Sequence, residues 1–477
     1  MTPAAAIAKP EVLPFGERVA EWAGPLVVKE VRAGLKSWAF AVAFGLLLSV
    51  GFVVVLTSAL VTSAGSEPRG PAAFMGTTAA FAVYGQLLVP FIAFRAMVRE
   101  REDETWVLLV LTGLGTDGIV RGKLLAALVQ VGLGAAAMAP FMLLSYLLSG
   151  IGLTNVLLGV GWHVCLAFLL TSAALGLGAQ SESRLERTVG HFVVLAGSLL
   201  LGGLSMALTG ALAFNGERLL RDGESIGLLL GLPVAMLLLG WCVLPAAAAS
   251  LALDSEARTQ PARARIGWTF LFLVVGTMVS ALVLNANRDV VCAIAVLNAL
   301  LLLVVGFFAV SERPGFPKAA ADDGFARPGT LRSVLVTFGL LALSAIAFGA
   351  VAAEANAAHT ALTIASPAFV MLYLSLGLLL GRFTPLKRLG TRTGARLGFF
   401  IATALGIVVP TVLAAIANKR PDKGPGWVFN PFFGMVRFID RSHLEAEALL
   451  LGGVAAVAAV TVLGVLQAED GVRTHEH

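Results

Sequence analysis

Long apolar stretches separated by short polar segments run along the whole chain. Apolar runs of roughly 18 residues or more are typical of membrane-spanning helices. The ten-residue segments of alternating hydrophobicity that mark a membrane β-barrel are absent. The pattern therefore predicts an all-α polytopic membrane protein with about 12 transmembrane helices. The expected spans are 39–61, 74–94, 124–148, 156–179, 190–213, 227–252, 267–285, 290–310, 331–352, 364–381, 395–417 and 446–467.

Composition supports this fold class, because 58% of the residues are hydrophobic and only 13% are charged. Soluble domains carry about a quarter charged residues. The three cysteines, Cys165, Cys242 and Cys292, lie far apart within apolar runs, so neither a disulfide framework nor a zinc site is expected. The N-terminal segment MTPAAAIAKPEVLPFGERVAEW has no apolar core, so we expect no cleavable signal peptide.

The distribution of basic residues predicts the orientation of the spans. If the N-terminus is cytoplasmic, 25 of the 34 Lys and Arg residues fall in inner segments. Because basic residues concentrate in cytoplasmic loops, both termini are expected inside. The net charge of +5 thus reflects the basic residues of the cytoplasmic loops, and no nucleic-acid partner is expected.

Residues 418–445 depart from this charge rule. The segment is basic, although it is expected outside, and it contains the aromatic sequence GWVFNPFFGMVRFI. Aromatic residues collect at membrane interfaces. We expect a short helix or re-entrant elbow on the outer surface, with its aromatic side chains at the interface. An ordinary long loop or a miscounted span is the alternative.

Several signatures of chemistry are missing from the sequence. Every Asp and Glu lies in a terminus, a loop or a span end, which argues against a proton-driven carrier but leaves sodium coupling open. The segment DGIVRGKL lacks the first Gly and the Ser or Thr of a phosphate-binding loop. The histidines lack metal-binding spacing, and no span displays a polar constellation that would name a substrate. The pairs Gly227–Gly231 and Gly377–Gly381 allow close helix packing.

The segment 100–114 combines a charged start with a short apolar run. Ten residues from Thr105 to Leu114 rise only about 15 Å as a helix, which is half the hydrocarbon thickness. The segment is therefore expected at the inner surface. Its acidic start is either a docking surface for a partner or a solvated helix turn whose acids face the helix dipole.

Two motifs in residues 24–141 resemble type-2 ATP-binding-cassette (ABC) permeases. The sequence ERE-x-x-TWVLLVLTGL, followed by IVRGK and a span containing PF, resembles the cytoplasmic segment between that family's second and third spans. GPLVVKEVRAGLKSW resembles the amphipathic helix that precedes its first span. Glu104 and Gly113 stand where the family usually has Gly and Pro.

The resemblance implies a role for two groups of residues. The residues that would couple to an ATPase are Glu100, Arg101, Glu102, Thr105 and Trp106, and the residues of the interfacial helix are Lys29, Glu30 and Arg32.

The resemblance also implies a domain division. Family members have six spans and pair as dimers. Residues 1–38 would form a cytoplasmic and interfacial segment, 39–253 a first six-helix half with coupling helix 100–114, and 254–477 a second six-helix half with external segment 418–445.

The implied function is that of a permease subunit of an ATP-driven exporter in the bacterial cytoplasmic (inner) membrane. Such a subunit is not itself an enzyme and binds no cofactor directly, since ATP is bound by a partner. The expected partners are a soluble ABC ATPase dimer and membrane lipid, and a second permease chain remains open. The alternatives are a secondary carrier and a non-transporting membrane scaffold that anchors a partner complex.

Overall fold

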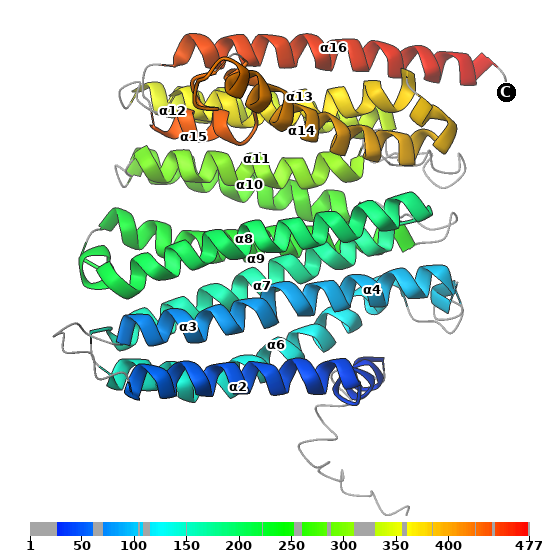
Figure 1. Ribbon diagram of the computed structural model, residues 1–477. Helices are drawn as coiled ribbons and strands as arrows, with labels where there is room; N and C mark the ends of the chain where they lie inside the picture. The colour runs from blue at the N-terminus through cyan, green and yellow to red at the C-terminus, as the bar shows by residue number, and fades with distance from the viewer. Residues whose placement is uncertain are drawn as a thin grey trace, which may run out of the picture. The chain divides into compact units, whose positions relative to one another are not determined.

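A computed structural model of the chain describes residues 26–60, 70–103, 105–107, 115–148, 150–221, 223–251, 260–283, 288–309, 330–354, 360–383, 385–424, 426–440 and 444–475. All regular secondary structure within these ranges is helical (Figure 1). The expectation of an all-α protein is therefore confirmed.

Each expected span coincides with one helical run. The runs are α2 (Trp38–Leu60), α3 (Gly70–Ala82) continuing through the π-helix η1 (Val83–Leu88) into α4 (Val89–Glu102), α6 (Thr116–Leu147), α7 (Leu153–Gln180), α8 (Arg184–Leu219), α9 (Gly223–Leu251), α10 (Gln260–Val283), α11 (Arg288–Ala309), α12 (Thr330–Glu354), α13 (Thr360–Phe383), α14 (Thr391–Ile416) and α16 (Glu445–His475).

Length and apolar composition show that the protein is polytopic. Among the described residues, ten of these runs are long and apolar enough to cross a membrane. The other two, α10 and α11, contribute shorter apolar stretches, Ala264–Val275 and Ile294–Phe307. A membrane protein with many spanning helices is thus established, whereas the count of twelve stays a prediction.

The chain divides into two compact units. Unit 1 comprises Met1–Leu175 and Val194–Phe214, and unit 2 comprises Gly176–Val193 and Asn215–His477. The boundaries fall inside α7 and α8, and α8 is kinked at Asn215, whose φ is −125° and ψ is 17°. The expected division into two six-helix halves near residue 254 describes a possible sequence repeat, whereas these units are defined by contacts. The expected division therefore stays a prediction.

Unit 1 is built on α2, α3 and α6, which lie side by side in blue and cyan in Figure 1 and pack on one another. The run from α3 to α4 is interrupted by the π-turn η1, which also packs on α6. A π-turn inserts one residue into the helical ladder and often marks a functional position. Residues 26–35 form a further helix ahead of α2.

Unit 2 is organised around α13, which packs on α11, α12, α14 and α16. Gly377 and Gly381 allow α14 to approach closely: a Cβ atom at Gly377 would lie 2.6 Å from the Cα of Phe399. The predicted role of this glycine pair in packing is therefore confirmed. The pair containing Gly231 differs, because a Cβ atom there would meet nothing within 4 Å.

The segment after α14 forms the short helix η4 (Trp427–Phe429) and then α15 (Phe433–Asp440). A short helix is thus present as expected. Asn430 fixes its start, because its side-chain oxygen accepts hydrogen bonds from the backbone N–H groups of Phe432 and Phe433, both at 3.0 Å.

The expectation that the aromatic residues of this segment lie at the membrane interface is wrong for Phe438, and it stays a prediction for Trp427, Phe429, Phe432 and Phe433. Phe438 is fully buried and packs on Trp427 and Phe369, with ring centroids 5.5 and 6.4 Å apart. The Arg437 guanidinium lies 4.0 Å from the Trp427 ring centroid and donates a hydrogen bond to the backbone oxygen of Asp422. For Phe438, burial of its large apolar area in the core of unit 2 outweighs the interfacial preference of the ring.

Candidate functional site: a buried ion-pair joint and an intramembrane polar cluster

The helix of residues 26–35 packs along the start of α6 through one face. A Cβ atom at Gly122 of α6 would lie 2.9 Å from the Leu26 side chain, and one at Gly34 would clash with the side chain of Gln130. Leu26, Glu30 and Gly34 are spaced by four residues, so they share one helix face. The basic residues Lys29 and Arg32 are exposed. The interfacial helix expected from sequence is therefore an amphipathic helix bound to α6.

Lys123, near the start of α6, joins this helix to the end of α4. Its ammonium group lies 2.7 Å from a carboxylate oxygen of Glu100 and 3.5 Å from one of Glu30. The Lys123 side chain is only 5% exposed, and those of Glu100 and Glu30 are 17% and 21% exposed. Removing these charges from water is unfavourable, and the attraction of the Lys123 cation to both carboxylates offsets that cost. We call these three residues the ion-pair joint.

The joint changes the interpretation of the acidic run. The sequence pattern left Glu100 free to face water or a partner. In the structure α4 continues to Glu102, which turns Glu100 toward Lys123 within unit 1. Glu102 and Asp103 remain exposed. Of the three acids from residue 100 to residue 103, those two present their side chains to the surface.

The residues that follow are described only in part. Residues 105–107 are helical, Thr105 is exposed, and the Arg101 guanidinium carbon lies 5.4 Å from the Trp106 ring centroid. Residues 108–114, which complete the expected coupling helix, lie outside the described part of the chain. The start of that helix therefore lies beside the ion-pair joint, with Trp106 held by a cation–π contact.

A second constellation lies in the apolar region of unit 1 and escaped sequence analysis. His163 of α7 is fully buried, and its Nδ1 atom lies 2.6 Å from the amide nitrogen of Gln86 in the π-turn η1. Its Nε2 atom lies 3.0 Å from the hydroxyl of Thr209 in α8. Ser205, one turn earlier, donates to the Gln86 side-chain oxygen at 3.2 Å. We call these four residues the polar cluster.

The orientation assigned to the Gln86 amide sets the proton positions in the polar cluster. The Gln86 amide donates to Nδ1, so Nε2 carries the ring proton and donates to Thr209. The Thr209 hydroxyl then donates to the backbone oxygen of Ser205 at 2.8 Å. No single span displays this constellation, which forms only when three helices come together. Its members lie on three helices far apart in sequence, and only the π-turn aims Gln86 at His163.

Comparison with known protein families, curated proteins and solved structures finds no match to the chain. Among the residues that the structure describes, no group of three or more His, Cys, Asp or Glu side chains is arranged to hold a metal ion.

Proposed function

We propose that the protein is the membrane subunit of an ATP-driven ABC transporter. Its ATPase partner binds the exposed residues next to the ion-pair joint. The observation that carries this proposal is the joint itself, which links an amphipathic surface helix, the end of one long helix and the start of the next. Support also comes from the sequence resemblance of residues 24–141, whose two motifs contain Glu30, Glu100 and Lys123. Twelve spans, cytoplasmic termini and export from a bacterial inner membrane belong to the same proposal.

The joint suits the transmission of force. A partner that moves Glu102, Asp103 or Trp106 moves the end of α4, because Glu102 is its last residue, Asp103 is its C-cap and Trp106 stacks with Arg101 of the same helix. Lys123 then carries the displacement into α6 and the helix of residues 26–35 through charge-assisted contacts in a poorly hydrated site. Packed helices shift as units, so motion at the surface changes how the helices of unit 1 pack.

Purification from native membranes tests this function. We expect an ATPase with phosphate-binding-loop and ABC signature motifs to co-purify with the chain. Reversing both exposed acids, as Glu102→Lys with Asp103→Lys, should lower its recovery at least tenfold while leaving the chain inserted, because complementary charge at a small interface controls association. Glu217→Lys is the matched control, since its side chain is 89% exposed in the last turn of α8, at the end expected outside. Equal ATPase recovery from all three preparations contradicts the proposal.

The polar cluster favours a second candidate function, a secondary carrier. A titratable side chain inside the membrane is a default candidate for ion coupling, and His163 is fully buried among Gln86, Ser205 and Thr209. The two functions separate in a proteoliposome containing the chain alone. A carrier conducts protons in response to an imposed pH gradient and loses this flux in His163→Phe, whereas a permease subunit without its ATPase shows no difference between wild type and variant.

A further inference from the structure

The turn that follows α14 carries three exposed cations. The helix ends at Ile416, and the exposed residues Lys419, Arg420 and Lys423 follow shortly after it. Asp422 is the only acidic residue between α14 and α15. The segment therefore keeps a net positive charge, although the orientation expected from the basic residues puts it outside, where such residues are scarce. The proposed function leaves this departure from the charge rule unexplained.

The backbone of this turn has a defined conformation. Asn418 has a φ of 51°, in the left-handed region, and its N–H group donates to the backbone oxygen of Ala415 at 3.0 Å. The Lys419 N–H group donates to the backbone oxygen of Ala414 at 2.8 Å, which completes a Schellman motif. Gly424 then packs on α14, since a Cβ atom there would lie 2.7 Å from the Cα of Ala414. The three cations therefore lie on a turn that is held against the helix.

α14 also presents an exposed apolar face that ends at this turn. Leu405, Val409, Val412 and Ile416 are 50%, 47%, 49% and 77% exposed, and their spacing places them on one side of the helix. From Leu405 to Ile416 the helix rises about 16 Å, close to the hydrocarbon thickness of one leaflet. Because Thr393–Ile416 is long and apolar enough to span a membrane, this face is expected against lipid tails, with its end at the boundary with water.

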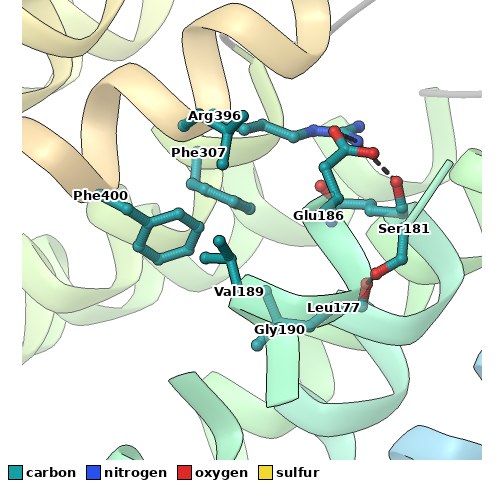
Figure 2. A pocket seen from close by; sticks show the side chains of 10 residues that line it. Leu177, Ser181, Glu186, Val189, Gly190, Phe307, Arg396 and Phe400 are labelled. Carbon is teal, nitrogen blue, oxygen red and sulfur yellow. Dashed lines mark hydrogen bonds and ion pairs between the residues drawn. The ribbon is translucent and has the colours of Figure 1, made fainter. Parts of the chain in front are cut away.

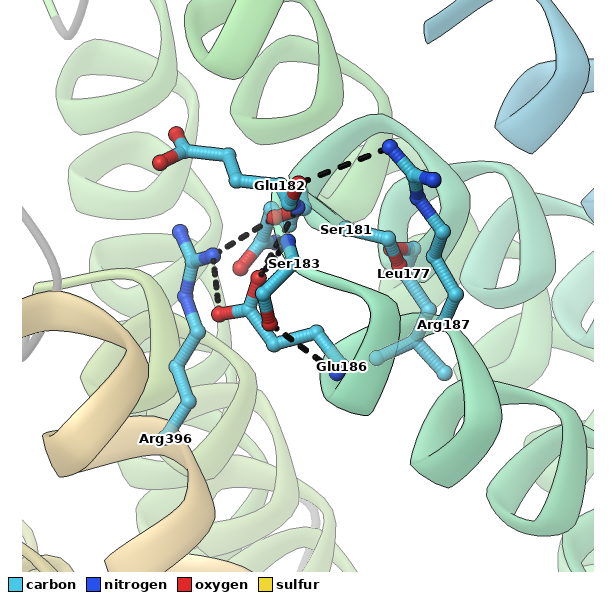
Figure 3. Close-up of polar contacts among 8 residues, drawn as sticks. Leu177, Ser181, Glu182, Ser183, Glu186, Arg187 and Arg396 are labelled. Carbon is cyan, nitrogen blue, oxygen red and sulfur yellow. Dashed lines mark hydrogen bonds and ion pairs between the residues drawn. The ribbon is translucent and has the colours of Figure 1, made fainter. Parts of the chain in front are cut away.

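Arg396, near the opposite end of α14, already has its partners. It donates to the backbone oxygen of Gln180 at 2.7 Å and to a Glu186 carboxylate oxygen at 3.3 Å, and both side chains of that ion pair are 7% exposed (Figure 3). One turn later, Phe400 packs on Phe307, with ring centroids 5.5 Å apart (Figure 2). The helix is thus held at this end, where its buried charge is neutralised within the protein, in contrast to the exposed charges beyond its other end.

We infer that this surface binds an anionic phospholipid, whose headgroup contacts Lys419, Arg420 and Lys423 while its acyl chains lie along the apolar face of α14. A phosphate headgroup supplies the charge that complements three exposed cations, and each basic residue near a charged membrane surface raises the affinity about fivefold. The cations and the apolar face adjoin at Ile416, as the headgroup and the tails of one lipid molecule do. The surface needs no ATPase partner, so the inference stands apart from the proposed function.

A quencher attached to the lipid tests this surface locally. Ile416→Cys carries a fluorescent maleimide, in a parent chain whose three native cysteines are replaced by alanine. In phosphatidylcholine vesicles, doxyl-labelled phosphatidylglycerol should quench this label with at least tenfold higher affinity than doxyl-labelled phosphatidylcholine. Lys419→Gln with Arg420→Gln and Lys423→Gln should make the two affinities equal. Salt at about 1 M should weaken the preference of the parent chain, because the Debye length shortens to about 3 Å.

The matched control removes two cations from the end of another helix. Arg218 and Arg221 are exposed at the end of α8 that is expected on the same side of the membrane. Arg218→Gln with Arg221→Gln should leave the preference for phosphatidylglycerol at Ile416 unchanged. The triple variant changes only exposed side chains and keeps the backbone hydrogen bonds of the turn, so it should unfold at the same temperature as the parent chain.

Three results would overturn the inference. The first is a triple variant that keeps the preference for phosphatidylglycerol, since the cations would then not bind the headgroup. The second is a control variant that loses this preference, because the effect would then come from the overall charge of that side of the protein. The third is relief of quenching by soluble glycerol 3-phosphate, which would make a free phosphate ester the ligand in place of a lipid.

Discussion

The Lys123 ammonium group lies 2.7 Å from a carboxylate oxygen of Glu100 in a setting where the lysine side chain is only 5% exposed. Two residues earlier in α6, Arg121 makes a pair with Asp117 at 2.5 Å, but those side chains are 50% and 43% exposed. The cations of the two pairs lie on the same helix, but Arg121 pairs within α6 at the surface, whereas Lys123 pairs with a residue of α4 in a buried setting. Comparing substitutions in the two pairs therefore shows how much more a buried ion pair contributes to stability than an exposed one.

Replacing Lys123 by Met should destabilise unit 1 strongly. The change leaves Glu100 and Glu30 buried without their cation, and breaking a buried pair in this way costs about 3–5 kcal/mol, reduced here because both acids are partly exposed. Arg121→Met should cost less than about 1 kcal/mol, since exposed pairs contribute little. Chemical denaturation in detergent measures both values. Equal effects of the two substitutions would show that the joint is hydrated and adds no stability.

A second substitution checks the cause of that loss. Adding Glu100→Gln to Lys123→Met should recover part of the stability, because it removes one of the two unpaired charges. A simple sum of the two single effects would instead indicate that the Lys123 side chain acts through its packing alone.

Gly381→Ala should weaken the contact between α13 and α14. A Cβ atom at Gly381 would lie 2.6 Å from the backbone nitrogen of Ala395, and neither backbone can yield without moving its helix. We expect a loss of about 1–3 kcal/mol, as for overpacking. Gly453→Ala in α16 is the control, because a Cβ atom there meets nothing within 4 Å. Unchanged thermal stability of Gly381→Ala, measured beside Gly453→Ala, would count against this close contact.

The sequence predicted the helices well because the bilayer imposes a length and an apolar composition on each one. It predicted the glycine contact of α13 for a similar reason, since G-x-x-x-G places two small residues on one face. The pairing of Lys123 with Glu100 was not predicted. A charge at a span end has the same sequence signature whether it faces water or another helix, and only the extension of α4 to Glu102 decides between them.

The polar cluster shows a second limit of sequence analysis. Gln86, His163 and Thr209 are single polar residues in otherwise apolar spans, and none has a characteristic spacing to the others. The π-turn that turns Gln86 toward His163 has no sequence signal of its own. The prediction for Phe438 was wrong for a different reason. The aromatic composition of its segment indicated an interfacial position, but the sequence did not show that Phe438 packs on Phe369.

Thr209→Val should destabilise the protein by more than Thr337→Val. Both hydroxyls are buried and donate at 2.8 Å to the backbone oxygen four residues earlier, but only Thr209 is in hydrogen-bond contact with His163. The Thr209 change leaves a buried ring N–H without an acceptor, which costs about 1–2 kcal/mol. Thermal unfolding in detergent measures the difference. Equal effects would mean that the contact between His163 and Thr209 contributes nothing measurable.

Single cysteines should locate the expected loops on opposite sides of the membrane. Arg221→Cys, whose native side chain is 84% exposed, should react with an impermeant maleimide added outside intact cells, whereas Lys387→Cys, exposed in the short helix Pro385–Leu389, should react only after permeabilisation. The wild-type chain, with Cys165, Cys242 and Cys292, supplies the background. Reversed labelling would overturn the orientation taken from the basic residues.

A third cysteine decides between ten and twelve spans. Residues 221 and 387 fall on opposite sides in either case, because α10 and α11 together return the chain to the face from which it entered. Arg288, the first residue of α11, lies between these two helices and distinguishes the counts. If both cross, Arg288→Cys reacts from outside like Arg221→Cys. If both lie at the inner surface, it behaves like Lys387→Cys. We expect outside labelling, since Gln260–Val283 and Arg288–Ala309 have 24 and 22 residues, enough to span about 30 Å at 1.5 Å per residue.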